Sequence, residues 1–293
     1  MISRLEKNKK ERKKVEKIEK KNKTKNILIA ILKTFLITIL ILLSIFVVIR
    51  YIANFGIVVR EYPLSYDNIP ESFNGFKIVQ FGDIYYNQYS NDLSYYIDKI
   101  NELKPDLVIF SGGLKHKNYT PSSKEEKYLI SELSKIKSSV GNYYVLGNSD
   151  DEKSEQILIK SNFKSIIDKT EKIYFEDNIP IILRGIATTP NVDYKDSKDL
   201  FKINVIYEPD LTIDILSYNS PQIIMAGKAI NGQFRLPYLN GLIKDNGYKK
   251  YNEKEYSIND TKLFITGGLG TNNYPFRLFN HPSINFYRLM KKN

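Results

Sequence analysis

The 293-residue sequence contains no cysteine and no tryptophan, and its only histidines are His116 and His281. Because cysteine is absent, disulfides, thiolate zinc sites, redox motifs and cysteine nucleophiles are excluded. Two histidines leave no plausible Ser-His-Asp triad. There is no P-loop, and the segment from Gly267 to Gly270 lacks the spacing of a dinucleotide-binding fingerprint. The sequence therefore excludes several common catalytic classes.

Net positive charge is small outside the N-terminal segment. The formal net charge is +11, and residues 1–25 carry twelve Lys or Arg against four Glu. Only +3 of that charge therefore belongs to the other residues. A nucleic-acid-binding domain needs a concentrated basic surface, so we expect no nucleic-acid partner for the folded part.

One long apolar run is present, at residues 27–49. A helix of this length spans about 35 Å, which is enough to cross a bilayer. Its interior charge, Lys33, lies near the N-terminal end, where its long side chain can reach the lipid headgroups. No small-residue cleavage pattern follows Ile49, so we expect an uncleaved anchor at residues 26–50. A cleavable signal peptide is the alternative.

The basic residues set the expected topology. Because Lys and Arg stay on the cytoplasmic side, we predict a single-pass protein of the cell membrane with a cytoplasmic tail at residues 1–25. Residues 51–293 would then form an extracytoplasmic domain. Glu and Lys spacing in the tail would allow a helix on anionic lipid, although a solvated topology signal is the interpretation we favour. Frequent Ile, Lys, Asn and Tyr indicate a bacterium with a low-GC genome.

Beyond the anchor, short apolar segments alternate with amphipathic ones. Periodicity predicts strands over residues 76–81, 106–110 and 143–146 and helices over residues 93–103, 125–136 and 151–159. The second half is richer in expected strands, at residues 172–175, 179–186, 203–207, 223–226, 263–266 and 284–289. This order predicts an α/β fold, a layered α/β/β/α sandwich of two mixed sheets.

Glycine and polar residues follow several expected strands, where ligands collect in such folds. The segments are Gly82-Asp83-Ile84-Tyr85, Ser111-Gly112-Gly113-Leu114, Gly147-Asn148-Ser149-Asp150, Tyr207-Glu208-Pro209-Asp210 and Gly227-Lys228-Ala229-Ile230-Asn231-Gly232-Gln233. Their order resembles the calcineurin-like metallophosphoesterases. More narrowly, it is similar to a membrane-anchored bacterial subgroup with the motifs D-x-H, G-D-x, G-N-H-D, H-x-P-D and G-H-T-H-G-G-Q. The resemblance covers about residues 60–293 and includes the closing Gly267-Gly268-Leu269-Gly270-Thr271 and Pro275-Phe276-Arg277.

The resemblance implies two metal ions about 3.5 to 4 Å apart that bind a phosphoryl oxygen and generate a hydroxide nucleophile. Only Asp83 and Asn148 keep the ligand residue types of the motifs. The other five ligand positions, which are Asp or His in the motifs, are occupied by Tyr85, Gly113, Tyr207, Lys228 and Ile230. Ser149 replaces the histidine that assists the leaving group, and Asp150, which would orient that histidine, remains.

These residues are too poor in negative charge for two divalent cations. One carboxylate and one amide cannot offset the hydration that the ions lose, and the Lys228 ammonium adds positive charge. We therefore expect no metal cofactor. One weakly bound divalent ion such as Mn²⁺, held by Asp83, Asn148 and His116, is the alternative, although both histidines fit a surface or loop position better. We also expect Lys228 to pair with Asp83, and Tyr85 and Tyr207 to fill the cleft.

Three functions remain open from the sequence. We favour a membrane-anchored pseudoenzyme that binds an extracytoplasmic ligand or envelope protein. The second is an active metal-dependent phosphoesterase that hydrolyses lipid or cell-wall phosphates with one metal. The third is an interaction protein whose basic tail binds anionic membrane lipid or a cytoplasmic partner.

Overall fold

The computed structural model describes residues 4–54, 56–87, 92–187, 199–218, 220–235, 241–272 and 274–292. The chain divides into two compact units, Met1–Ile52 and Ala53–Asn293. Each unit is described separately below.

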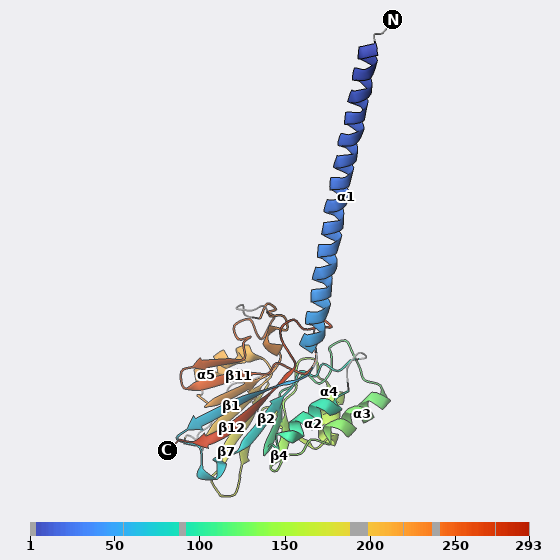
Figure 1. Ribbon diagram of the computed structural model, residues 1–293. Helices are drawn as coiled ribbons and strands as arrows, with labels where there is room; N and C mark the ends of the chain where they lie inside the picture. Colours follow the sequence, from blue (N-terminus) through green and yellow to red (C-terminus); the bar gives the residue numbers. More distant parts are fainter. Residues whose placement is uncertain are drawn as a thin grey trace. The chain divides into compact units, whose positions relative to one another are not determined.

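The first unit is formed by one long helix, α1 (Arg4–Asn54) (Figure 1). Between Lys7 and Val48 it contains a window of mean hydropathy 2.7, so it is long and apolar enough to cross a membrane. Its apolar side chains are exposed, as Leu28 and Leu32 are, each at 68%. The basic residues 4–25 belong to the same helix. The tail is therefore helical, which is the conformation that the alternative of a helix on anionic lipid requires.

The second unit contains two six-stranded sheets (Figure 1). The first sheet has the order β1-β12-β2-β3-β4-β5. Its strands are β1 (Val58–Tyr66), β12 (Ser283–Lys291), β2 (Lys77–Phe81), β3 (Leu107–Phe110), β4 (Gly141–Tyr144) and β5 (Phe163–Ser165). Only β12 and β2 pair in antiparallel fashion, so this sheet is mixed.

The second sheet has the order β10-β11-β9-β8-β7-β6. Its strands are β10 (Glu255–Ile258), β11 (Thr261–Ile265), β9 (Ile223–Ala226), β8 (Lys202–Ile206), β7 (Ile181–Ile186) and β6 (Thr170–Ile173). The two outer pairs are antiparallel and the inner strands are parallel. This sheet is therefore mixed as well.

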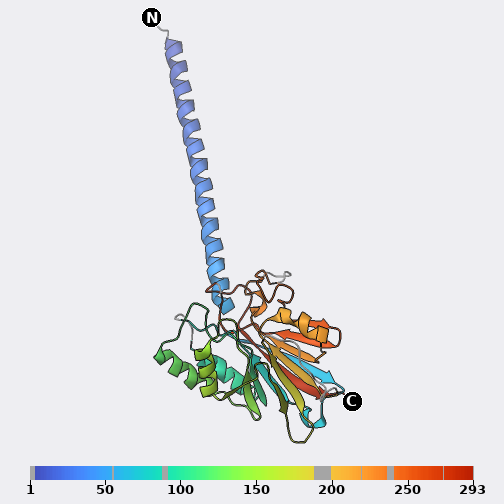
Figure 2. The same cartoon turned by 180° about the vertical axis from the view of Figure 1, so that it is seen from behind.

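Helices cover the outer faces of the sheets (Figure 2). The first sheet packs against α2 (Ser94–Glu102), α3 (Ser123–Leu133) and α4 (Glu152–Lys160), and the second packs against α5 (Thr212–Tyr218). Among the described residues, the short 3-10 helices η1 (Glu71–Phe73), η3 (Pro209–Leu211) and η4 (Ile230–Gly232) lie in connections. The layers are thus α/β/β/α, as the sequence predicts.

Alternation along the strands explains the two-sided burial of the sheets. In β2, Ile78 belongs to the core between the two sheets, together with Ile203 and Met225 of the second sheet. The next residue, Val79, packs with Ile97 of α2 on the outer face. Successive side chains of a strand point to opposite faces, so one apolar run such as residues 76–81 serves both layers.

Most predicted elements are confirmed, and the differences have local causes. The sequence patterns do not predict β1, β5, β10 or α5. β1 contains Pro63 and several exposed residues, β5 has only three residues, and β10 alternates exposed and half-buried positions. β4 begins at Gly141, two residues before the predicted start of that strand.

Candidate functional site

The loops that follow parallel strands of both sheets meet around Asp83. The backbone amide of Asp83 donates to the Gly112 carbonyl at 2.8 Å, which joins the loops after β2 and β3. From the second sheet, the Lys228 amide donates to Asp83 Oδ1 at 3.1 Å and the Thr266 hydroxyl donates to Oδ2 at 3.3 Å. The segments singled out in the sequence are therefore neighbours in space.

Asp83 is fully buried at the centre of these loops. Burial raises the pKa of its carboxyl to about 7, and hydrogen bonds from Tyr85, the Lys228 amide and Thr266 oppose the rise. Both carboxylate oxygens accept hydrogen bonds from the protein itself.

Tyr85 and Tyr207 lie beside Asp83 and contact each other. Their hydroxyl oxygens are 3.1 Å apart, and both side chains are buried. The Tyr207 ring packs tightly on the neighbouring loops, because a Cβ on Gly147 would lie 2.7 Å from its Cε2. Burial, more than any other cause, raises the pKa of both phenols well above the usual value. The two tyrosines thus make the kind of hydroxyl contact that the sequence analysis expects of them.

The prediction of an ion pair between the Lys228 and Asp83 side chains is wrong. The Lys228 ammonium pairs with the Glu208 carboxylate, and only the Lys228 backbone amide contacts Asp83. Asn148 is exposed, and its side-chain amide donates to Glu208 Oε1 at 2.8 Å. Glu208, which the sequence analysis did not assign to the site, therefore accepts from both Lys228 and Asn148. Its position next to Tyr207 in the sequence was the signal that could have assigned it to the site.

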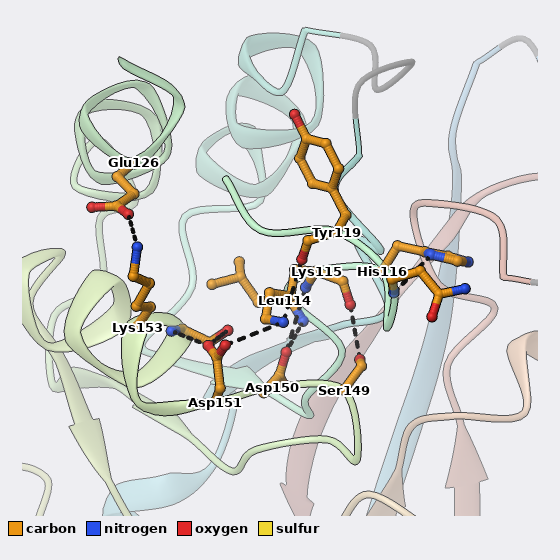
Figure 3. A network of polar contacts seen from close by, with 11 residues as sticks. Leu114, Lys115, His116, Tyr119, Glu126, Ser149, Asp150, Asp151 and Lys153 are labelled. Carbon is orange, nitrogen blue, oxygen red and sulfur yellow. Dashed lines mark hydrogen bonds and ion pairs between the residues drawn. The ribbon is translucent and has the colours of Figure 1, made fainter. Parts of the chain in front are cut away.

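Asp150 fixes the backbone of the two loops that follow β3 and β4 (Figure 3). Its carboxylate accepts from the amides of Gly113 and Leu114 at 2.8 Å each and from the Gly147 amide at 2.7 Å. Burial raises the pKa of this carboxyl, and the same amides oppose the rise. Ser149 donates to the Lys115 carbonyl at 2.8 Å. The contacts of Asp150 and Ser149 therefore connect loops of the scaffold.

Gly113 and Ile230 leave no donor atoms at two of the ligand positions. Gly113 has φ +79°, and a Cβ there would lie 2.8 Å from Asp83 Oδ1. Ile230 is buried with φ +39°, a conformation that costs a β-branched residue of order 1–3 kcal/mol. Its carbonyl accepts from the Asn280 side chain at 2.7 Å, which helps to hold this backbone.

The two histidines lie in loops, as the sequence analysis expects. His116 Nδ1 accepts from the Asn118 amide at 3.4 Å (Figure 3). His281 is half-buried in the connection before β12. Within the described ranges, no group of three or more Asp, Glu or His side chains is placed to hold a metal ion.

The residues present do not fit the pair of metal ions that the resemblance implies. Asp83 is the one charged ligand position kept, and its oxygens are engaged by Lys228 and Thr266. The Lys228 ammonium also lies nearby, with its nitrogen 5.9 Å from the centre of the Tyr207 ring. Phenols with strongly raised pKa values, an aliphatic side chain and a glycine occupy other ligand positions, and none of these replaces the imidazole nitrogen or carboxylate oxygen of the motifs.

Comparison with known proteins places this arrangement in a family. The sequence profile of the calcineurin-like phosphoesterases matches residues 76–268. The uncharacterized metallophosphoesterase YkuE of Bacillus subtilis (strain 168) is 28% identical over 258 residues, covering 83% of this chain and 89% of YkuE. The crystal structure of TT1561 from Thermus thermophilus is similar with a TM-score of 0.42 and 10% identity, covering 67% of this chain and 91% of that one. GAP50, the anchor in the inner membrane complex of Plasmodium, gives a TM-score of 0.41 and 13% identity, covering 73% and 81%. Because the profile spans more than half of the chain, this protein belongs to the calcineurin-like phosphoesterase family.

Proposed function

We propose that this protein is a membrane-anchored pseudoenzyme, which keeps the phosphoesterase fold but does not hydrolyse phosphoesters. The observation that carries the proposal is the replacement of metal ligands by internal contacts. Tyr85 bonds to Tyr207, and Lys228 pairs with Glu208. With these contacts, the side chains at the former ligand positions have partners within the protein and need no cation.

Neither Asp83 nor Asp150, the two aspartates of the site, supplies an alternative base. A metal-free site must deprotonate water by a side chain that reaches the substrate. Asp83 has a pKa of about 7, which would suit a base, but its side chain has no exposed surface. The Asp150 carboxylate is committed to three strongly bonded backbone amides. A buried and fully bonded carboxylate cannot accept a proton from an attacking water.

A second candidate function, phosphoester hydrolysis with one metal, is favoured by one feature of the cleft. Glu208 and Asn148 lie within 2.8 Å of each other at the exposed side, so displacement of the Lys228 ammonium would leave one carboxylate and one amide for a cation. The substrates would be lipid or cell-wall phosphates.

The test is hydrolysis of bis(4-nitrophenyl) phosphate by the full chain in detergent with added Mn²⁺. The pseudoenzyme predicts that wild type and Asp83→Ala give the same background rate. The matched control is Asp214→Ala, which removes an exposed aspartate from α5. Mn²⁺-dependent turnover that is lost in Glu208→Gln, which removes the carboxylate ligand of the second candidate, and kept in Asp214→Ala would establish that candidate instead.

We also propose that α1 anchors the folded unit on the outer side of the cell membrane. The absence of cysteine allows a direct test, because any introduced thiol is unique. Ser220→Cys and Asn22→Cys place a thiol at exposed positions of the folded unit and of the tail. A membrane-impermeant maleimide should label Ser220→Cys in intact cells and Asn22→Cys only after permeabilisation. The reverse pattern would show the opposite orientation.

The helical tail limits which basic residues can contact lipid. A straight helix rises about 1.5 Å per residue, and electrostatic attraction falls off over about 8–10 Å at physiological salt. We therefore propose that Lys23 and Lys25, next to the apolar run, contact anionic headgroups. Their replacement by Gln should weaken labelling by headgroup-crosslinking lipid, whereas replacement of Lys7 and Lys9 should not.

A further inference from the structure

A second polar cluster lies at Gly267. The next residue, Gly268, packs on the Asp83 side chain. A Cβ built on Gly267 would lie 2.1 Å from Ser283 Oγ, 2.9 Å from Asn231 Nδ2 and 3.1 Å from Arg60 Nη2. These three side chains, from β12, η4 and β1, therefore converge on one point. We refer to Arg60, Asn231 and Ser283 as the Arg60 cluster.

Asn231 and Ser283 of the Arg60 cluster are buried, Arg60 is half-buried, and four polar atoms of the cluster lack partners. Asn231 and Ser283 have no exposed surface. Arg60 Nη1, Asn231 Nδ2, Asn231 Oδ1 and Ser283 Oγ make no hydrogen bond in the part of the chain that the structure describes. Buried polar groups are almost always bonded, so several such atoms at one place indicate a missing partner.

The surroundings of the Arg60 cluster are positively charged. Within the described ranges, Arg60 has no carboxylate at ion-pair distance, whereas its neighbour Arg235 is paired with Glu253 at 2.6 Å. Burial lowers the pKa of Arg60, the Tyr62 phenol opposes this shift, and the charge of Arg235 adds to it. Burial is the main cause that lowers the pKa of Arg277 to about 10, and the charge of Arg60 contributes to this shift. A water molecule would satisfy donors but would leave this charge without compensation.

We propose that the Arg60 cluster binds a small oxyanion of the phosphate or sulfate type. Such an anion supplies several acceptor oxygens for Arg60, the Asn231 amide and the Ser283 hydroxyl, together with the negative charge that the site lacks. The Asn231 carbonyl oxygen can accept the proton of a hydrogenphosphate. The site uses neither Asp83 nor a metal, so it is independent of the proposed loss of hydrolysis.

Isothermal titration calorimetry of the full chain in detergent, with EDTA present, tests the proposal. The probes are inorganic phosphate and sulfate, with chloride at matched ionic strength as the reference. We expect saturable binding of phosphate or sulfate that Arg60→Gln weakens at least about tenfold, because a charge-assisted hydrogen bond is lost. The matched control is Arg288→Gln, which removes an exposed arginine from β12 and should leave binding unchanged.

A second set of measurements separates binding from folding. Without anion, Arg60→Gln should unfold at the same or a higher temperature than wild type, since it removes an uncompensated buried charge. Ser283→Ala, a smaller change, should also weaken phosphate binding. If phosphatidic acid added to the micelles competes with phosphate, the anion comes from a lipid headgroup, and without competition it is a free anion. Absence of saturable binding in wild type, or equal binding by Arg60→Gln, overturns the proposal.

Discussion

The hydroxyl oxygens of Tyr85 and Tyr207 lie 3.1 Å apart, although the two residues are separated by 122 positions in the sequence. Each stands where the motifs of the family carry histidine. An imidazole at either position could direct a nitrogen lone pair to a metal, whereas the two phenols bond to each other. The contact thus joins the two sheets at the place where the family motifs would place a metal centre.

This contact predicts a measurable coupling between the two tyrosines. Removal of either hydroxyl, in Tyr85→Phe or Tyr207→Phe, should reduce the free energy of unfolding by about 1 kcal/mol, because a buried partner is left unbonded. The double variant should be less destabilised than the sum of the single changes, by about 0.5–1 kcal/mol. Urea unfolding of the full chain in detergent, followed by circular dichroism, measures the four stabilities. Strict additivity would contradict a direct bond.

The buried Asp83 predicts that stability falls between pH 4 and pH 7. Its pKa is about 7 in the folded protein, while an unfolded aspartate has a pKa of about 3.9. The folded state therefore keeps a proton that the unfolded state releases, and this stabilisation is lost as pH rises through the folded pKa. At pH 8, the ionised carboxylate should cost up to about 4 kcal/mol.

Asp83→Asn should remove most of this pH dependence. We expect its unfolding temperature to exceed that of wild type at pH 8, and the difference to shrink at pH 5. Asp214→Asn, at an exposed site on α5, is the control and should keep the wild-type slope. A wild-type protein that becomes more stable from pH 5 to pH 8, with the same slope in Asp83→Asn, would show that Asp83 is ionised throughout.

Gly113 stands at a ligand position where the motif G-D-x of the family carries aspartate, and we predict that one substitution cannot restore that aspartate. A Cβ at Gly113 would lie 2.8 Å from Asp83 Oδ1 and 2.9 Å from its Cα, at φ +79°. Gly75 has a similar φ of +89° but nothing within 4 Å, so it isolates the backbone cost. Gly75→Ala should destabilise by about 1 kcal/mol, and Gly113→Ala by a further 1–3 kcal/mol from crowding. If Gly75→Ala and Gly113→Ala lower the unfolding temperature equally, the loop around Asp83 accommodates the added methyl group without crowding.

Much of the fold could be predicted from local patterns. Buried strands such as residues 76–81 produce strong apolar runs. The capping box between Ser122 and Glu125 was a further signal that the sequence analysis did not use, and the predicted helix therefore begins at residue 125 and not at Ser123. The confirmed family resemblance, carried by the order of the strand-end motifs, indicated that these segments would converge. Edge strands such as β1 carry weaker signals, because exposed residues interrupt their apolar pattern.

Side-chain contacts in the site were harder to predict. The motif order places Lys228 near Asp83, and its backbone amide is indeed there. The direction of a long, flexible side chain depends on which carboxylate lies within reach, and the sequence analysis did not assign Glu208 to the site. The Arg60 cluster joins residues more than 200 positions apart along the chain, so only the folded structure reveals it.

The most direct test of the central claim is the metal content of the full chain after incubation with excess Mn²⁺ and removal of free ions. Elemental analysis should find far less than one Mn²⁺ per chain, and Asp83→Ala should give the same value. Two tightly held ions per wild-type chain, lost in Asp83→Ala, would contradict the account.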